Sequence, residues 1–237
     1  METRVRNQKR SSILCLLLYP TLCVLSVLCG EMATAQNLEE IIRDIDEKQR
    51  QIQTFSATFT QKKETSLATE PLLSSGRVHF KRPDRIHWSY LKPERAEVAL
   101  EDRTFWVYLP DRSQAEKVSL SRKAGGVQTL EALTAIFKKT FNELTEGYTI
   151  YSEGLEEERL YHFRLQPKEE KDRKVLSRID LWIDKSSGAI LRFIMVEANG
   201  DHLSLEFGDP QINPPLTDDQ LKIRIPPAVR VREQSLP

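Results

Sequence analysis

Histidine and cysteine are the side chains here that are best suited to nucleophilic or metal chemistry, and both are scarce. The 237 residues contain three cysteines, at positions 15, 23 and 29, and four histidines, which are His79, His87, His162 and His202. Neither a Gly-x-Ser-x-Gly nor a His-Glu-x-x-His motif occurs, so nothing sets a nucleophile or a metal beside a base. We therefore predict no catalytic residue, no metal and no cofactor, and we expect a binding protein rather than an enzyme.

Two of the histidines lie in residues 76–90, where apolar and polar residues alternate as in paired strands. Directly opposed residues of an antiparallel pair share one face of a sheet. A three-residue loop at 82–84 keeps the two faces separate, whereas a two-residue turn at Pro83 and Asp84 would mix them. The favoured register pairs Lys81 with Arg85, Phe80 with Ile86, His79 with His87 and Val78 with Trp88. Two facing histidines without a third ligand are more typical of a solvated polar pair than of a metal site.

Arg82 occupies an even-numbered position and so continues the apolar face beyond Phe80. An arginine at the rim of an apolar surface can extend its charged end to water. Alternatively, its guanidinium can donate several hydrogen bonds to carbonyls of an element that covers the sheet. The second arrangement would make Arg82 a latch.

The first 35 residues have the order of a secretory signal peptide. Four basic residues precede an apolar run at 13–28, and Ala33-Thr34-Ala35 forms a cleavage site. A membrane anchor is the first alternative, but the run is short for a span of about 20 residues and contains Pro20. A lipoprotein signal is the second, but each cysteine follows a leucine instead of a small residue. We expect cleavage after Ala35, with residues 1–35 as signal peptide and 36–237 as a single domain.

Cleavage there would leave a chain without cysteine, so a hydrophobic core and not disulfides must stabilise it in an oxidising compartment. The whole chain has 35 basic and 35 acidic residues. Residues 1–35 contain four of the basic and two of the acidic ones, so residues 36–237 keep 31 basic and 33 acidic residues. This balance argues against nucleic-acid binding, which needs a basic stripe.

The remaining pattern predicts two amphipathic helices and a run of short strands. The first helix starts at Asn37 and ends near Gln53, with apolar residues at 38, 41, 42, 45 and 52. The second starts at Thr129 and stops at Gly147. The expected strands are 55–63, 76–81, 85–90, 96–100, 104–109, 148–152, 160–166, 177–183, 190–198, 202–207 and 220–225, with a short pairing at 229–232. Residues 168–174 are expected to form an exposed loop.

Residues 104–109 and 190–196 are apolar on both strand faces. Such strands need cover on both sides. The helices can cover one side, and a closed core or a cavity for an apolar ligand can cover the other. The pattern leaves both possibilities open.

Several of these residues form a pattern that resembles the LolA family of periplasmic lipoprotein carriers. The match comprises Phe55-x-x-x-Phe59-Thr60-Gln61, Gly76-x-x-x-Phe80-Lys81-Arg82-Pro83-Asp84, Trp88, Pro93, Trp106-x-Tyr108-x-Pro110 and Leu221-x-Ile223-x-Ile225-Pro226-Pro227 followed by Val229. It is strong from about 55 to 110 and diffuse from 115 to 215. The sequence departs from the family at Glu101-Asp102-Arg103, where an Asp-Gly turn is common, and in its charged centre.

The resemblance implies a mainly β fold with some α structure: an incomplete antiparallel β-barrel, or half-barrel, covered by amphipathic helices that form a lid over an apolar cavity. It implies Arg82 as the lid latch. The implied cavity residues are Phe59, Val78, Phe80, Ile86, Trp88 and Val98, and the implied lid residues are Leu133, Ile136 and Phe137. Each of these could equally be ordinary core.

The resemblance also implies a function and partners. A soluble, monomeric periplasmic protein would shield lipoprotein acyl chains and carry lipoproteins from an inner-membrane ABC transporter to an outer-membrane acceptor. The alternative is a carrier of another envelope lipid or glycolipid that works with a different exporter. A regulatory sensor on a related half-barrel would normally need an additional domain.

Overall fold

The computed structural model describes residues 37–101, 104–119 and 138–235 of the chain. The chain divides into two compact units, residues 1–42 and 43–237. Within the first unit, the described residues 37–42 are helical. The second unit holds every described strand. The expected signal peptide and the expected lid residues Leu133, Ile136 and Phe137 lie outside the described residues.

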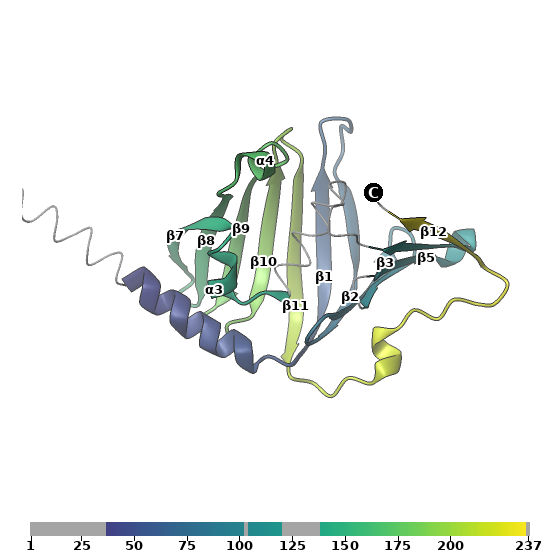
Figure 1. The fold of residues 1–237 in the computed structure, drawn as a ribbon, viewed down its shortest axis with the longest axis horizontal. Coiled ribbons are helices and arrows are strands. Elements are labelled where there is room, and N and C mark those ends of the chain that lie inside the picture. Colours follow the sequence, from purple (N-terminus) through teal and green to yellow (C-terminus); the bar gives the residue numbers. More distant parts are fainter. Residues whose placement is uncertain (1–36, 102–103, 120–137, 236–237) are drawn as a thin grey trace, which may run out of the picture. The chain divides into compact units, whose positions relative to one another are not determined.

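The described strands form one twelve-stranded sheet in the order β12-β6-β5-β4-β3-β2-β1-β11-β10-β9-β8-β7 (Figure 1). Neighbouring strands are antiparallel, apart from the parallel pair β12 and β6. The sheet is open, with β12 and β7 at its edges. The strands are β1 (Thr54–Glu64), β2 (Leu72–Lys81), β3 (Arg85–Lys92), β4 (Ala96–Glu101), β5 (Thr104–Leu109), β6 (Gln114–Ser119), β7 (Tyr148–Glu156), β8 (Leu160–Pro167), β9 (Leu176–Asp184), β10 (Ile190–Glu197), β11 (His202–Ile212) and β12 (Arg230–Ser235). The predicted mainly β fold with an unclosed antiparallel sheet is confirmed.

In the described part of the chain, the longest helix spans residues 37–51. Shorter helical elements there include α3 (Phe141–Leu144), α4 (Glu170–Arg173) and the 3-10 helices η1 (Pro110–Arg112) and η2 (Asp218–Leu221). Among the described residues, no helix has both the length and the apolar character needed to cross a membrane.

The predicted register of the β2–β3 hairpin is confirmed. Lys81 pairs with Arg85, Phe80 with Ile86, His79 with His87 and Val78 with Trp88, around a loop at residues 82–84. Because the pairs continue across the sheet, large apolar side chains gather on one side, here called the apolar face. It includes Phe55, Phe59, Val78, Phe80, Ile86, Trp88, Val98, Leu100, Phe105, Phe163, Leu181, Phe193, Leu205 and Phe207. The opposite side, the polar face, includes Arg77, His79, His87 and Ser89.

Three predictions are wrong in the described residues. Residues 220–225, expected as a strand, contain the end of η2, because Thr217 and Gln220 form a capping arrangement in which Thr217 N donates to Gln220 Oε1 at 2.9 Å. The helix expected to run from Thr129 to a stop at Gly147 is interrupted in its described part, because Thr140 caps a new helix, α3, with Glu143 accepting from Thr140 N at 2.7 Å. The charged stretch expected as a loop contains α4, and β6 was not predicted.

Candidate functional site

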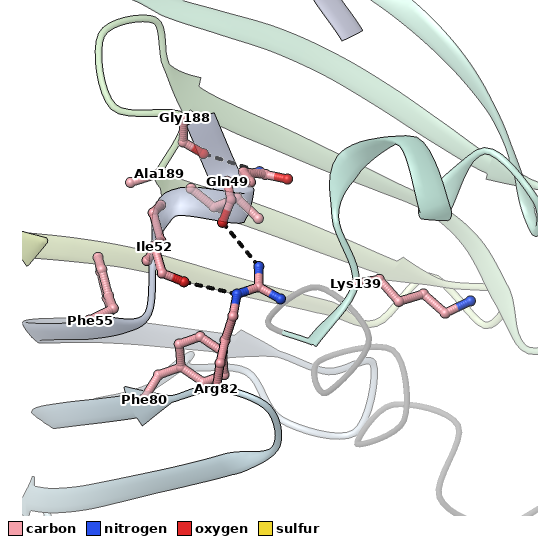
Figure 2. A pocket seen from close by; sticks show the side chains of 9 residues that line it. Gln49, Ile52, Phe55, Phe80, Arg82, Lys139, Gly188 and Ala189 are labelled. Atoms are coloured by element: carbon pink, nitrogen blue, oxygen red, sulfur yellow. Dashed lines mark hydrogen bonds between the residues drawn. The ribbon is translucent and has the colours of Figure 1, made fainter. Parts of the chain in front are cut away.

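Arg82 follows β2 and reaches the end of the helix at residues 37–51 (Figure 2). Its Nε donates to the carbonyl oxygen of Ile52 at 2.8 Å and its Nη2 to that of Gln49 at 3.1 Å. Its Nη1 donates to the carbonyl of Lys138 at 3.3 Å. One guanidinium thus connects the β2–β3 loop, the helix end and the segment that precedes α3.

Helix geometry explains why these carbonyls are available. The last four carbonyl groups of an α-helix have no partner within the helix, and a positive charge near that end is favourable. Arg82 supplies both a donor and a charge there, and its backbone N–H donates to Gln53 O at 2.9 Å. Arg82 and these acceptors, together with the Gln49 and Asp46 side chains, are here called the Arg82 junction.

The Gln49 side chain makes the second connection at the junction. It is 7% exposed, its Nε2 donates to Gly188 O at 3.1 Å, and its Oε1 accepts from Phe141 N at 2.7 Å. Gln49 therefore joins the helix to the β9–β10 turn and to the start of α3. Sequence reasoning missed it, although its spacing from Ile45 and Ile52 places it on the apolar stripe of the helix. A polar residue in an apolar stripe is the signal that would have identified it.

Asp46 completes the junction one turn earlier. It is 8% exposed and accepts hydrogen bonds from Asn142 N at 3.2 Å and Arg50 Nε at 2.8 Å. Burial opposes its ionisation, but hydrogen bonds from the Thr140 side chain, Arg50 and the Asn142 amide outweigh that effect, and the pKa of Asp46 lies below its ordinary value. The carboxylate therefore stays charged at neutral pH and fixes α3 against the helix.

A cavity of about 50 Å³ lies beside Arg82 (Figure 2). Its lining combines the junction with the end of the apolar face and consists of Gln49, Ile52, Phe55, Phe80, Arg82, Lys139, Gly188, Ala189 and Ile190. Binding sites for organic ligands usually have about 300–1,000 Å³. In the described arrangement, this cavity is too small for an acyl chain.

An aromatic cluster lies further along the apolar face. The Phe59 ring packs edge-on against Trp88 and Tyr90, with ring centroids 4.9 and 5.0 Å apart. The ring centroids of Phe207 in β11 and Trp88 are 6.1 Å apart. Tyr90 donates to Gln61 Oε1 at 3.0 Å, and burial raises the pKa of Tyr90 to about 12. The cluster forms an apolar surface with a neutral polar pair, Tyr90 and Gln61, at its border.

The structure brings the expected cavity residues onto this one face. Phe59, Val78, Phe80 and Ile86 are buried, whereas Trp88 and Val98 are partly exposed. Phe141 of α3 packs on Phe163 of β8, with ring centroids 4.6 Å apart, so α3 covers part of the same face. That these residues line a ligand cavity stays a prediction.

The polar face holds the paired histidines. The Nδ1 atom of His87 lies 2.8 Å from the carbonyl oxygen of Gln220, and its Nε2 atom lies 2.5 Å from Glu97 Oε2. Burial opposes ionisation of Glu97, but hydrogen bonds from His87 and Ser89 outweigh it and lower the pKa of Glu97. Among the described residues, no group of three or more His, Cys, Asp or Glu is arranged to hold a metal ion. His87 instead attaches the segment around η2 to the sheet.

A larger cavity, of about 550 Å³, also lies on the polar face. The described residues that line it come from β4, β5, the end of η2, the segment after η2 and β12, and include Ala99, Trp106, Leu221, Ile223 and Val231. Its size falls within the range of ligand sites. A lipid could therefore bind in this cavity instead of on the apolar face, and a test of lipid binding must distinguish the two places.

Gly188 is expected to be essential for the contact between the helix and the β9–β10 turn. It has a φ of +73°, and a Cβ atom there would lie 2.8 Å from Lys48 Cβ. Gly188→Ala should lower the free energy of unfolding by about 2–4 kcal/mol, from the left-handed backbone penalty and the contact together. Thermal and urea unfolding would measure this.

Gly200→Ala is the matched control, because Gly200 has a φ of +90° and a Cβ atom added there would meet nothing within 4 Å. It carries the backbone penalty alone, of about 1–2 kcal/mol. Equal losses in the two variants would show that the helix does not depend on the close approach at Gly188.

The stability of the fold is expected to depend on His79 below neutral pH. Burial, His87 and Arg77 lower the pKa of His79 below its ordinary 6.5. As the pH falls through 6.5, the unfolded chain binds a proton that the folded protein does not, so stability decreases. Urea unfolding at about pH 7.5 and about pH 5 should therefore show that His79→Gln loses less free energy of unfolding between the two pH values than the natural protein does. Arg77→Gln should reduce the loss partially, and identical losses in all three proteins would contradict the assignment.

Comparison with known proteins places this fold in a family. A family model described as outer membrane lipoprotein carrier protein LolA matches residues 50–224. The outer-membrane lipoprotein carrier protein of Edwardsiella ictaluri is 24% identical over 205 residues, which are 86% of this chain and 92% of that protein. That of Serratia proteamaculans is 23% identical over 183 residues, which are 77% and 83% of the two chains.

A solved structure shares the fold. The structure of an uncharacterized conserved protein from Thermus thermophilus matches with a TM-score of 0.53 and 16% identity, over 84% of this chain and 99% of that one. At that identity the likeness concerns the fold alone. The family model, by contrast, spans most of the sequence, and the chain therefore belongs to the LolA family of outer membrane lipoprotein carrier proteins.

Proposed function

We propose that this protein is a periplasmic carrier that shields lipoprotein acyl chains against the apolar face of its sheet and releases them to an acceptor. The observation that carries the proposal is the combination of an aromatic apolar face with a cover held by the Arg82 junction. Its action is binding and release, without a chemical reaction. Residues 1–35 would direct secretion and be removed after Ala35, leaving residues 36–237 as a single carrier domain.

The energetics of acyl chains explain why such a face is needed. Burying one methylene group gains about 0.8 kcal/mol, so a chain of about 16 carbons gains on the order of 10 kcal/mol on leaving water. Trp88 of β3 and Val98 of β4 offer apolar surface from neighbouring strands, and the buried ring of Phe59 supports Trp88 from beneath. Trp88 and Val98 remain partly exposed, so a ligand can reach them.

Cargo can be released only if the closed, cargo-free protein is similar in free energy to the protein with cargo bound. The Arg82 junction can stabilise that closed state. A hydrogen bond contributes a net amount of about 1 kcal/mol. The three bonds of Arg82 therefore favour the closed arrangement by a few kcal/mol, which is enough to oppose cargo without excluding it. Since the neighbouring cavity has about 50 Å³, we propose that cargo entry separates the helix from the β2–β3 loop and breaks these bonds.

The proposed partners are those that the family resemblance implies. An inner-membrane ABC transporter would load the carrier, an outer-membrane acceptor would unload it, and the carrier would act as a monomer. The relatives from Edwardsiella ictaluri and Serratia proteamaculans are named outer-membrane lipoprotein carrier proteins. That name supports lipoprotein as the cargo of this chain.

The test uses protein purified from the periplasmic fraction and freed of detergent. We expect it to bind a fluorescent fatty acid with equimolar stoichiometry and to extract a newly acylated lipoprotein from inner-membrane vesicles. Mass spectrometry of the gently purified protein identifies its natural load. Absence of both binding and extraction would refute the proposal, and a co-purified glycolipid without any lipoprotein extraction would replace it with a carrier of another envelope lipid.

A further inference from the structure

The hairpin between β1 and β2 carries exposed leucines at and beside its apex. Leu67 lies in the connecting residues 65–71 and is 96% exposed, while Leu72 and Leu73 at the start of β2 are 54% and 63% exposed. The hairpin reaches the upper edge of the sheet in Figure 1. Single exposed leucines are ordinary on protein surfaces, but a concentration of them marks a site of interaction.

The placement of the leucines indicates what they contact. Leu72 pairs with Lys63 and Leu73 pairs with Lys62, and successive residues of a strand point to opposite sides. The exposed leucines therefore lie at the apex and on both sides of the hairpin. A protein surface that docks on one side would leave the other side in water. A medium that surrounds the apex would bury all three.

We infer that the apex of the β1–β2 hairpin inserts into the surface of a lipid bilayer. The acyl-chain layer of a bilayer is a medium that surrounds the apex and accepts leucine side chains. Lys63 lies beside the leucines and can extend its ammonium group to the lipid headgroups, whereas the Lys62 ammonium group pairs with Glu64 Oε1 at 2.9 Å. The same hairpin carries Glu64 and Glu70, so its charges balance and insertion is driven by the apolar side chains.

The insertion would bring the bilayer next to the proposed cargo face. The strands that form the hairpin also carry Phe59 and Val78 on the apolar face. The inference goes beyond the proposed function, because it concerns contact between protein and membrane that needs no cargo. It is therefore tested with cargo-free protein.

The first measurement is co-sedimentation of the secreted form with vesicles of neutral phosphatidylcholine. We expect binding by the natural protein and at least a tenfold weaker partition for Leu67→Glu, since the change puts a charge in place of the leucine that the bilayer would bury. Leu155→Glu is the matched control, because Leu155 is a 43% exposed leucine on the edge strand β7. It should bind as the natural protein does. Leu67 is almost fully exposed, so neither folding nor thermal stability should change.

The second measurement locates the contact. Residues 36–237 contain no cysteine, so Leu67→Cys and Leu155→Cys can each carry one environment-sensitive fluorophore. We expect vesicles to shift the emission of the label at position 67 to shorter wavelength and to leave the label at 155 unchanged. Equal shifts, or natural protein that stays in the supernatant, would overturn the inference and favour a protein partner for the hairpin.

Fatty-acid binding separates this inference from the proposed function. Leu67→Glu should bind the fluorescent fatty acid as the natural protein does, because position 67 lies outside the apolar face. Loss of fatty-acid binding in every form would refute the carrier proposal while leaving vesicle binding intact.

Discussion

Replacing Arg82 with leucine is expected to tighten the binding of a fatty acid while making the protein less stable. The variant loses hydrogen bonds to the carbonyls of Ile52, Gln49 and Lys138. At about 1 kcal/mol each, these bonds contribute about 3 kcal/mol to the closed state, and the melting temperature should fall by roughly 6–12 °C. Because cargo no longer has to break these bonds, its affinity should rise at least tenfold and its transfer to an acceptor should slow.

The opposite signs of the two effects distinguish a latch from an ordinary structural residue. A residue needed only for folding would lower stability and affinity together. Arg112→Leu is the control, because the Arg112 side chain is 56% exposed and bonds Glu94 at the surface, where an ion pair contributes less than about 1 kcal/mol. It should change neither quantity measurably. Weaker fatty-acid binding by Arg82→Leu, with unchanged transfer, would rule out the latch.

Phe59→Ala is expected to have the second large effect. Phe59 is 2% exposed and holds the Trp88 and Tyr90 rings. Removing its ring should cost about 3–5 kcal/mol of stability, through lost burial and the cavity left behind. It should also weaken fatty-acid binding at least tenfold, because Trp88 loses its support. Urea unfolding and fluorescence titration measure the two effects, and Phe59→Leu provides a milder variant if the alanine protein does not fold.

Phe163→Ala separates the two effects of this prediction. Phe163 is fully buried on the same face, but it lies under Phe141 of α3 on the other half of the sheet. It should lose as much stability as Phe59→Ala and keep its fatty-acid affinity within about twofold. If both variants lose affinity equally, the aromatic cluster around Phe59 is core and not a binding surface.

The β2–β3 hairpin was predictable because its information is local. Strand alternation and a loop at residues 82–84 allow one register that keeps Phe80 and Ile86 on the same face. That register places Arg82 at the rim of the apolar face, and the structure places carbonyl acceptors around its guanidinium. Its role as a latch remains a prediction.

The acceptors themselves were not predictable from local pattern. Gln49 and Phe141 lie 92 positions apart in the sequence, yet the Phe141 amide donates to the Gln49 side chain. Such a pairing depends on how the helix and the sheet pack, and strand or helix periodicity holds no information about it. The predicted strand at 220–225 failed for a related reason, since its alternating Leu221, Ile223 and Ile225 line the same cavity as Trp106 without joining the sheet.

The central claim is that an acyl chain binds against the apolar face. Of the three tryptophans, Trp88 lies on this face, while Trp106 lies on the polar face beside the larger cavity. The variant with Trp106→Phe and Trp182→Phe keeps Trp88 as its reporter, and the variant with Trp88→Phe and Trp182→Phe keeps Trp106. Bromine quenches tryptophan fluorescence at short range, so titration with a brominated fatty acid measures which face the chain occupies. The account predicts strong, saturable quenching of Trp88 and none of Trp106, and quenching of Trp106 alone would contradict it.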